Sequence, residues 1–213
     1  RTYAHLAVAI LAFIAIEYYL VNSPFAASLA SSMTGGMSWL VVIGLFMGVS
    51  YIANKLAVSQ TSQQMQYLGL ALFVVAEAIV FLPLLYIATI YGGDGVIASA
   101  GMMTLLLVGG ITATVFITKK DFSFMGSFLS MGGFVALGFI LCSMIFGFSL
   151  GLIFASVMVV FAGGAVLYST SNVLHQHSTD QHVAAALSLF ASVALLFFYI
   201  LQVLMSLGGA GDD

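Results

Sequence analysis

A single glutamate near the middle of a long apolar segment is the residue best placed to do chemistry in this chain. Glu77 is flanked by Phe73, Val74, Val80 and Phe81. A carboxylate at the centre of a bilayer is strongly disfavoured unless it is protonated, paired or exposed to a wet cavity. The position therefore predicts a proton or cation site. The alternative is a protonated glutamate that hydrogen-bonds to a neighbouring helix.

Two further residues are candidates for the same ion or proton path. Pro83 follows Glu77 by six residues, and its missing backbone N–H predicts a kink beside the carboxylate, although proline also serves packing alone. Glu17 precedes two tyrosines near the end of an earlier apolar segment, a pattern typical of the membrane interface. We expect Glu17 to reach lipid headgroups or water, with a role at the outer mouth of a path as the alternative.

Small polar side chains gather in the last two apolar segments. One segment ends in the sequence YSTSN at 168–172, and the next carries Ser188 and Ser192 one helical turn apart. If the segments face each other, Ser169, Asn172 and Ser192 form gate-side polar contacts near the cytoplasmic ends. The alternative is that each hydroxyl bonds to the carbonyl one turn earlier in its own helix.

The connection between these segments carries His175, His177, Asp180 and His182. Histidine and aspartate bind metals, and histidine also senses pH near neutrality. Their spacing fits no strong metal motif, so we expect a solvated loop without a metal. The chain also lacks the sequence motifs of hydrolases, metalloproteases and nucleotide-binding enzymes, which predicts a protein that is not an enzyme and needs no cofactor.

The composition of the chain indicates whether these residues are surrounded by water or by lipid. Of 213 residues, 62% are hydrophobic and 5% are charged, with a net charge of -3, whereas soluble domains have roughly a quarter charged residues. This excludes a soluble enzyme, a disordered chain and a nucleic-acid binder with a basic face. The chain is therefore predicted to be a polytopic protein of the lipid bilayer.

Seven apolar segments are long enough to cross the bilayer, which takes about 20 helical residues. They predict an all-α protein, a single transmembrane domain over residues 1–213, and a first segment that is retained as a span rather than removed as a signal peptide. The predicted spans lie near 4–21, 37–56, 65–91, 96–117, 124–146, 150–171 and 183–207.

The few cations predict the orientation of the chain. Arg1, Lys55, Lys119 and Lys120 fall on one side if the spans alternate, and short cytoplasmic loops accumulate Lys and Arg. We interpret the three lysines as topology anchors, which places the N-terminus in the cytoplasm and the C-terminus outside.

Glycines within the spans predict seams of close helix packing. Gly44 and Gly48 lie four residues apart, and glycine pairs occur at 109–110, 132–133 and 163–164.

Three segments of this chain are similar to parts of a known membrane-protein family. The segment TKKDFSFMGSFL at 118–129 resembles the entry to the fifth helix of the Bax inhibitor family of membrane proteins. The segments LYSTSNVLH at 167–175 and ALSLF at 186–190 resemble the last two helices of its bacterial YccA-like branch. The resemblance implies six helices around a central seventh and a place in the bacterial inner membrane.

The resemblance also implies two candidate activities from different classes. One is a pH-sensitive cation leak, with calcium as the transported ion. The other is binding to, and restraint of, the membrane protease FtsH, for which a cytoplasmic segment ahead of the first span would be the discriminating region. Leak members carry an acidic pair on the last two helices, where this chain has Ser169 and Ser192. Because hydroxyls do not ionise, the acidic mechanism does not carry over, and Glu77 is the central carboxylate left to replace it.

Overall fold

The computed structural model describes residues 1–35, 37–59 and 62–208, and these residues are helical without any strand. Their elements are α1 (Thr2–Val21), α2 (Ala26–Thr34), α3 (Ser38–Ala57), α4 (Gln63–Tyr91), α5 (Val96–Thr118), α6 (Met125–Phe146), α7 (Gly151–His175), the short 3-10 helix η1 (Thr179–Gln181) and α8 (His182–Gly208).

Seven of these helices are long and apolar enough to cross a membrane, which confirms the seven predicted spans. Most observed ends lie within two residues of the predicted ones. The exception is α7, which continues to His175 although we expected its span to end at residue 171. A helix satisfies its own backbone hydrogen bonds, so the chain remains helical for one more turn beyond the predicted end.

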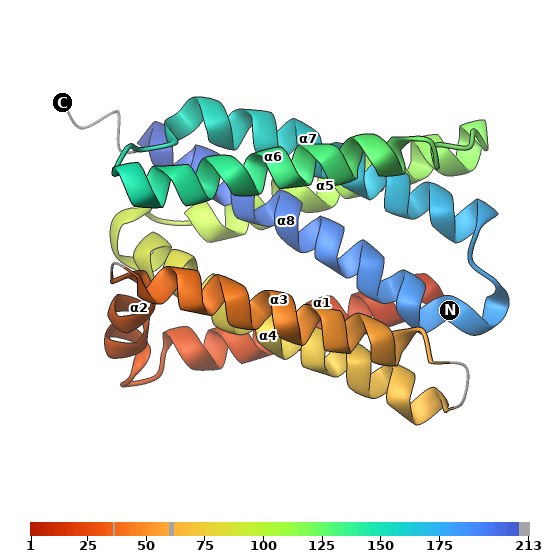
Figure 1. Cartoon of the computed structure of the whole chain (residues 1–213), viewed down its shortest axis with the longest axis horizontal. Helices are drawn as coiled ribbons and strands as arrows, with labels where there is room; N and C mark the ends of the chain where they lie inside the picture. Colours follow the sequence, from red (N-terminus) through yellow and green to blue (C-terminus); the bar gives the residue numbers. More distant parts are fainter. Residues whose placement is uncertain (36, 60–61, 209–213) are drawn as a thin grey trace. The chain divides into compact units, whose positions relative to one another are not determined.

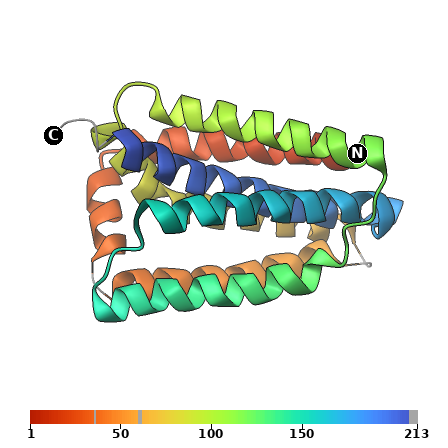
Figure 2. The ribbon, with the colours of Figure 1, turned by 90° about the horizontal axis from the view of Figure 1, so that it is seen from above.

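The short helix α2 was not predicted, because we expected only a connection over residues 22–36. Its nine residues are too few to span a bilayer. Ala26, Ala30 and Met33 are buried, and their spacing places them on one face of the helix. Figure 2 shows α2 lying across the ends of α1 and α3.

The chain divides into two compact units, which are coloured by sequence in Figure 1. The first unit contains Arg1–Ile90 and His177–Phe190, and the second contains Tyr91–Gln176 and the chain from Ala191. Helix α8 therefore contributes its first nine residues to one unit and the remainder to the other. The single-domain organisation expected from the sequence stays a prediction.

Aromatic side chains pack the interior of the first unit. Phe13 of α1 makes edge contacts with Phe81 of α4, at 5.2 Å between ring centroids, and with Phe190 of α8, at 5.9 Å. Phe73 also contacts Phe190 at 6.2 Å. Since lipid provides no hydrophobic drive for helix association, such close packing is what joins these helices.

Helix α7 lies between α5 and α6 in the second unit (Figure 2). A Cβ atom at Gly132 would lie 2.7 Å from the Phe161 ring, and one at Gly164 would lie 3.4 Å from Met125. Close packing at these two predicted glycine pairs is confirmed.

The other two predicted glycine seams are wrong. In the described part of the chain, nothing lies within 4 Å of a Cβ built at Gly44, Gly48, Gly109 or Gly110. These glycines lie on helix faces without a packed neighbour. The close approach in the first unit occurs instead at Gly69 of α4, where a Cβ would lie 2.5 Å from the Ala53 carbonyl oxygen.

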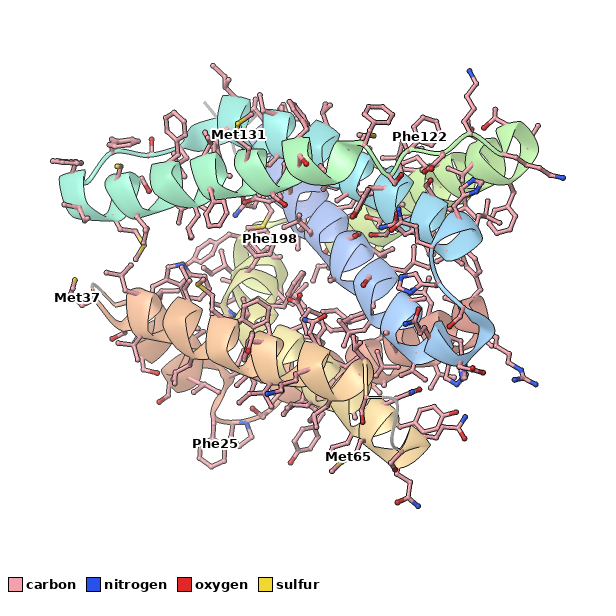
Figure 3. The ribbon with its side chains drawn as sticks, turned by 45° about the vertical axis from the view of Figure 1, so that its right-hand side comes forward. Phe25, Met37, Met65, Phe122, Met131 and Phe198 are labelled. Carbon is pink, nitrogen blue, oxygen red and sulfur yellow. The ribbon has the colours of Figure 1, made fainter. Side chains whose placement is uncertain are left out.

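The spans differ in how much of their surface is enclosed by protein. The apolar windows of α4 and α8 are 61% and 72% buried, whereas those of the other spans are between 6% and 22% buried. The central place that we expected for the last helix stays a prediction. Exposed apolar side chains such as Phe25 and Met131 project away from the ribbon in Figure 3, as expected of lipid-facing residues.

Candidate functional site

The second unit contains a hollow of about 840 Å³ lined largely by hydroxyl groups. Six of its nine lining residues are serine or tyrosine. The lining consists of Ser123, Gly126, Ser127, Leu129, Ser130, Ala165, Tyr168, Ser169 and Ser192. The lining contains no carboxylate and no cationic side chain, so the hollow offers neutral hydrogen-bonding groups.

Helical spacing brings the hydroxyls of α6 and α7 to one place. Ser127 and Ser130 are three residues apart on one face at the start of α6, and Ser123 lies in the turn that precedes this helix. Gly126 lets α7 approach this face, because a Cβ there would lie 2.9 Å from the Tyr168 hydroxyl oxygen. The glycine therefore creates the space that the tyrosine hydroxyl enters.

The hydroxyls of Ser169 and Ser192 form a hydrogen bond at the wall of this hollow. Their Oγ atoms are 2.9 Å apart, and each side chain is 7% exposed. Of the two alternatives that the sequence left open, the structure shows the one in which these residues face each other, while their role as a gate stays a prediction. Asn172 does not line the hollow, and its Oδ1 atom is buried without a hydrogen-bond partner among the described residues.

The charged connection before α6 is held in a fixed position. The Phe122 N–H donates to Ser171 Oγ at 2.8 Å, and the Ser123 N–H donates to Asp121 Oδ1 at 2.9 Å. Hydrogen bonds from the Ser123 hydroxyl and then its N–H lower the pKa of Asp121, and nearby His175 adds to this. The connection is thereby anchored at the same end of α7 as the serine pair.

The three predicted topology anchors lie at helix ends. Lys55 is in the last turn of α3, where the negative end of the helix dipole favours a cation. Lys119 caps α5 with a φ of 51°, which is unusual for a residue other than glycine. Lys120 follows it and is exposed. The side of the membrane on which these lysines lie stays a prediction.

Glu77 lies in the first unit, at the midpoint of α4. Its side chain is 8% exposed, and Phe73 and Phe81 lie one turn before and after it on the same buried face. Pro83 is also buried, and α4 continues through it to Tyr91. The structure thus places Glu77 in a protein interior rather than on the lipid-facing surface.

The expectation that Glu17 reaches headgroups or water is wrong. Its side chain is 4% exposed, and neither carboxylate oxygen has a hydrogen-bond partner among the described residues. The reason is its position on α1, since Leu6, Ala9, Phe13 and Glu17 occupy one buried face. Glu17 is therefore a second buried carboxylate of the first unit.

The expectation of a fully solvated histidine loop is also wrong at one position. His182 begins α8 and is 8% exposed. Its ring lies 4.9 Å from the ring of His5, which also contacts Tyr67. His5 and Tyr67 were missed because they are distant in sequence, although all three residues lie near the starts of spans that run in the same direction. Among the described residues, no three of His, Cys, Asp and Glu gather to hold a metal.

Comparison with known proteins identifies the family of this chain. The family model described as inhibitor of apoptosis-promoting Bax1 matches residues 1–209. The chain belongs to the Bax inhibitor family. Among its relatives in this family is the protein LIFEGUARD 4 of Arabidopsis thaliana, which is 27% identical over 211 residues, covering 95% of this chain and 82% of that protein.

Two bacterial relatives are more similar to this chain over shorter stretches. An uncharacterised protein of Pseudomonas aeruginosa is 38% identical over 122 residues, or 57% of this chain. YccA of Escherichia coli, named as a modulator of FtsH protease, is 32% identical over 114 residues, or 53% of this chain. The matches span about half of each relative, 54% and 52% respectively.

Proposed function

We propose that this Bax inhibitor family protein modulates a membrane protease of the FtsH type in the bacterial inner membrane. The observation that carries the proposal is the hydrogen bond between Ser169 and Ser192 in an uncharged hollow. A relative, YccA, is named as a modulator of FtsH protease. These two observations favour a protein-interaction role over a calcium leak at this site.

The chemistry of the hollow supports this choice. Calcium binding in proteins relies on oxygen ligands that include carboxylates, and binding strengthens with the number of charged ligands. The hollow presents the hydroxyls of serine and tyrosine and no carboxylate. A neutral lining of this kind suits hydrogen bonding to water or to a partner, whereas it provides no charge to hold a divalent cation.

The protease role predicts that the chain slows proteolysis independently of calcium. FtsH reconstituted with a membrane substrate should degrade that substrate several-fold more slowly when this protein is present. The rate should be the same with calcium or with a chelator, because no carboxylate lines the hollow. An unrelated seven-helix protein at the same density in the membrane is the control. Equal degradation with both proteins, and no co-purification with FtsH, would contradict the proposal.

A cation leak through the first unit is the second candidate function. The observation that favours it is the burial of two carboxylates, Glu17 and Glu77, at 4% and 8% exposure. Ionisable groups inside a membrane protein commonly mark ion or proton paths. This candidate assigns the path to Glu77, with Pro83 as the neighbouring hinge, calcium as the first ion to test, and the serine pair as a separate gate.

The leak predicts pH-dependent calcium flux into liposomes that contain the purified protein. Between about pH 6 and pH 8, Glu77→Gln should abolish the pH-dependent part of this flux, because the amide retains the shape of the side chain without its titration. Asp94→Asn, which changes an exposed carboxylate, should leave the flux unchanged. Flux equal to that of empty liposomes, with the wild-type protein folded, rejects this candidate.

A further inference from the structure

Three polar rings meet in the first unit, at residues other than its buried carboxylates. His5 comes from the first turns of α1, Tyr67 from the first turns of α4, and His182 begins α8. His5 Nε2 is 3.3 Å from the Tyr67 hydroxyl oxygen. The His5 and His182 ring centroids are 4.9 Å apart, with the ring planes tilted by 53°.

One hydrogen bond fixes the tautomer of His5. Its Nδ1 atom is 2.9 Å from the backbone carbonyl oxygen of Arg1. A carbonyl only accepts, so Nδ1 carries a hydrogen, and in the neutral ring Nε2 then presents a lone pair. Histidines that bind metals usually donate their other ring N–H in this way, to a carbonyl or a carboxylate.

We propose that His5, Tyr67 and His182 form a binding site for a divalent transition-metal ion, with zinc as the best fit. Zinc binds nitrogen and oxygen ligands at about 2.0–2.1 Å in a tetrahedral arrangement, which places neighbouring ligand atoms about 3.3 Å apart. This equals the separation of His5 Nε2 and the Tyr67 hydroxyl oxygen. A typical hydrogen bond from a hydroxyl is shorter than this distance.

The ring separation is compatible with a shared ion. Two imidazoles that bind one tetrahedral ion at these bond lengths have ring centres about 5 Å apart, and the His5 and His182 centres are 4.9 Å apart. His182 is 8% exposed and Tyr67 is 41% exposed, so the tyrosine is the more accessible of these two residues.

The donor set determines which cations this site selects. Imidazole nitrogen suits zinc, copper and nickel, whereas calcium and magnesium require mainly oxygen ligands. The amino-terminal ends of α1 and α8 carry partial positive charge, which weakens the binding of every cation, so the imidazole ligands must supply the affinity for the ion. Arg1 and Asp180 are the charged residues nearest in sequence to the two histidines, and both are exposed. They contribute opposite charges.

The site is tested by zinc titration of the full chain, free of any histidine tag, in nanodiscs. A Cys142→Ala background removes the exposed thiol as a competing ligand. We expect one zinc ion per chain by calorimetry, and a melting temperature that rises with zinc concentration because zinc binds the folded state. His5→Ala, His182→Ala and Tyr67→Phe should each weaken binding by at least about tenfold.

The controls separate this site from other zinc binding. His175→Ala and His177→Ala remove histidines of the same connecting region that lie outside the three-ring cluster, and they should leave the affinity unchanged. Calcium and magnesium should give no saturable binding. Tyr67→Phe keeps the ring contacts, so it tests the ligand even if a histidine variant fails to fold. No saturable zinc binding by the parent protein, or equal affinity in Tyr67→Phe and the parent, would overturn the proposal.

Discussion

Gly69→Leu is expected to destabilise the first unit by about 3 kcal/mol or more. A Cβ at this position would lie 2.5 Å from the Ala53 carbonyl oxygen and 2.7 Å from the Ala57 nitrogen. Both atoms belong to the backbone of α3, so no side-chain rotation relieves the clash. The helices must separate, and the packing that joins α3 to α4 in lipid is lost.

The measurement is thermal unfolding of purified protein, together with the yield of folded protein from membranes. Gly44→Leu is the matched control because it also lies in a span, and no described atom is within 4 Å of its Cβ. That variant should remain within about 0.5 kcal/mol of wild type. If Gly69→Leu unfolds at the same temperature as Gly44→Leu, α3 and α4 do not approach each other at Gly69.

The spans were predictable because the bilayer imposes their length. Each segment must be apolar over about 20 residues and must satisfy its own backbone hydrogen bonds, and both requirements can be read along the sequence. The same requirements do not apply to α2, which does not span the membrane. This helix has only nine residues, and its pattern of Ala26, Ala30 and Met33 was indistinguishable from a small-residue connection.

The direction in which a helix face points was less predictable. The pair Gly44 and Gly48 has the spacing of a packing motif, yet no neighbour occupies that face, whereas isolated Gly69 is closely packed. Spans in lipid are apolar on every side, so hydropathy does not distinguish a lipid-facing surface from a helix contact. Glu17 illustrates the same limit, because its place near a helix end suggested exposure although its face is buried.

The sequence indicated a contact between candidate residues only where they lie on consecutive helices. Ser169 lies in the second half of α7 and Ser192 in the first half of α8, so their meeting was one of two alternatives, and their hydroxyls do form a hydrogen bond. The contact of His5 with His182 joins residues 177 positions apart. Only the packing of α1 against the start of α8 brings them together, and the sequence gives no local sign of that packing.

The two units contain different kinds of buried polar groups. The first unit holds the buried carboxylates Glu17 and Glu77, and the second holds the hydroxyl-lined hollow. A calcium function at the serine pair would require charge that this chain does not supply there. Placing carboxylates at the serine pair by substitution therefore tests whether the missing charge is the reason that we expect no response of the wild-type site to calcium.

The double variant Ser169→Asp with Ser192→Asp is expected to lose about 3–5 kcal/mol of stability at neutral pH in the absence of calcium. The two wild-type oxygens are 2.9 Å apart and the side chains are 7% exposed, so two carboxylates there would be poorly solvated and would repel each other. Calcium should restore much of this loss, because carboxylate oxygens are its preferred ligands and binding stabilises the folded state.

The measurement is the melting temperature of the double variant and of wild type, each with calcium and with a chelator. Wild type should show no calcium effect, since its pair consists of hydroxyls. Ser169→Asn with Ser192→Asn is the matched control, because asparagine has the size of aspartate without its charge. Calcium should therefore stabilise the aspartate variant and leave the asparagine variant unchanged. An equal response of the two variants would show that space at the pair, rather than the missing charge, determines its behaviour.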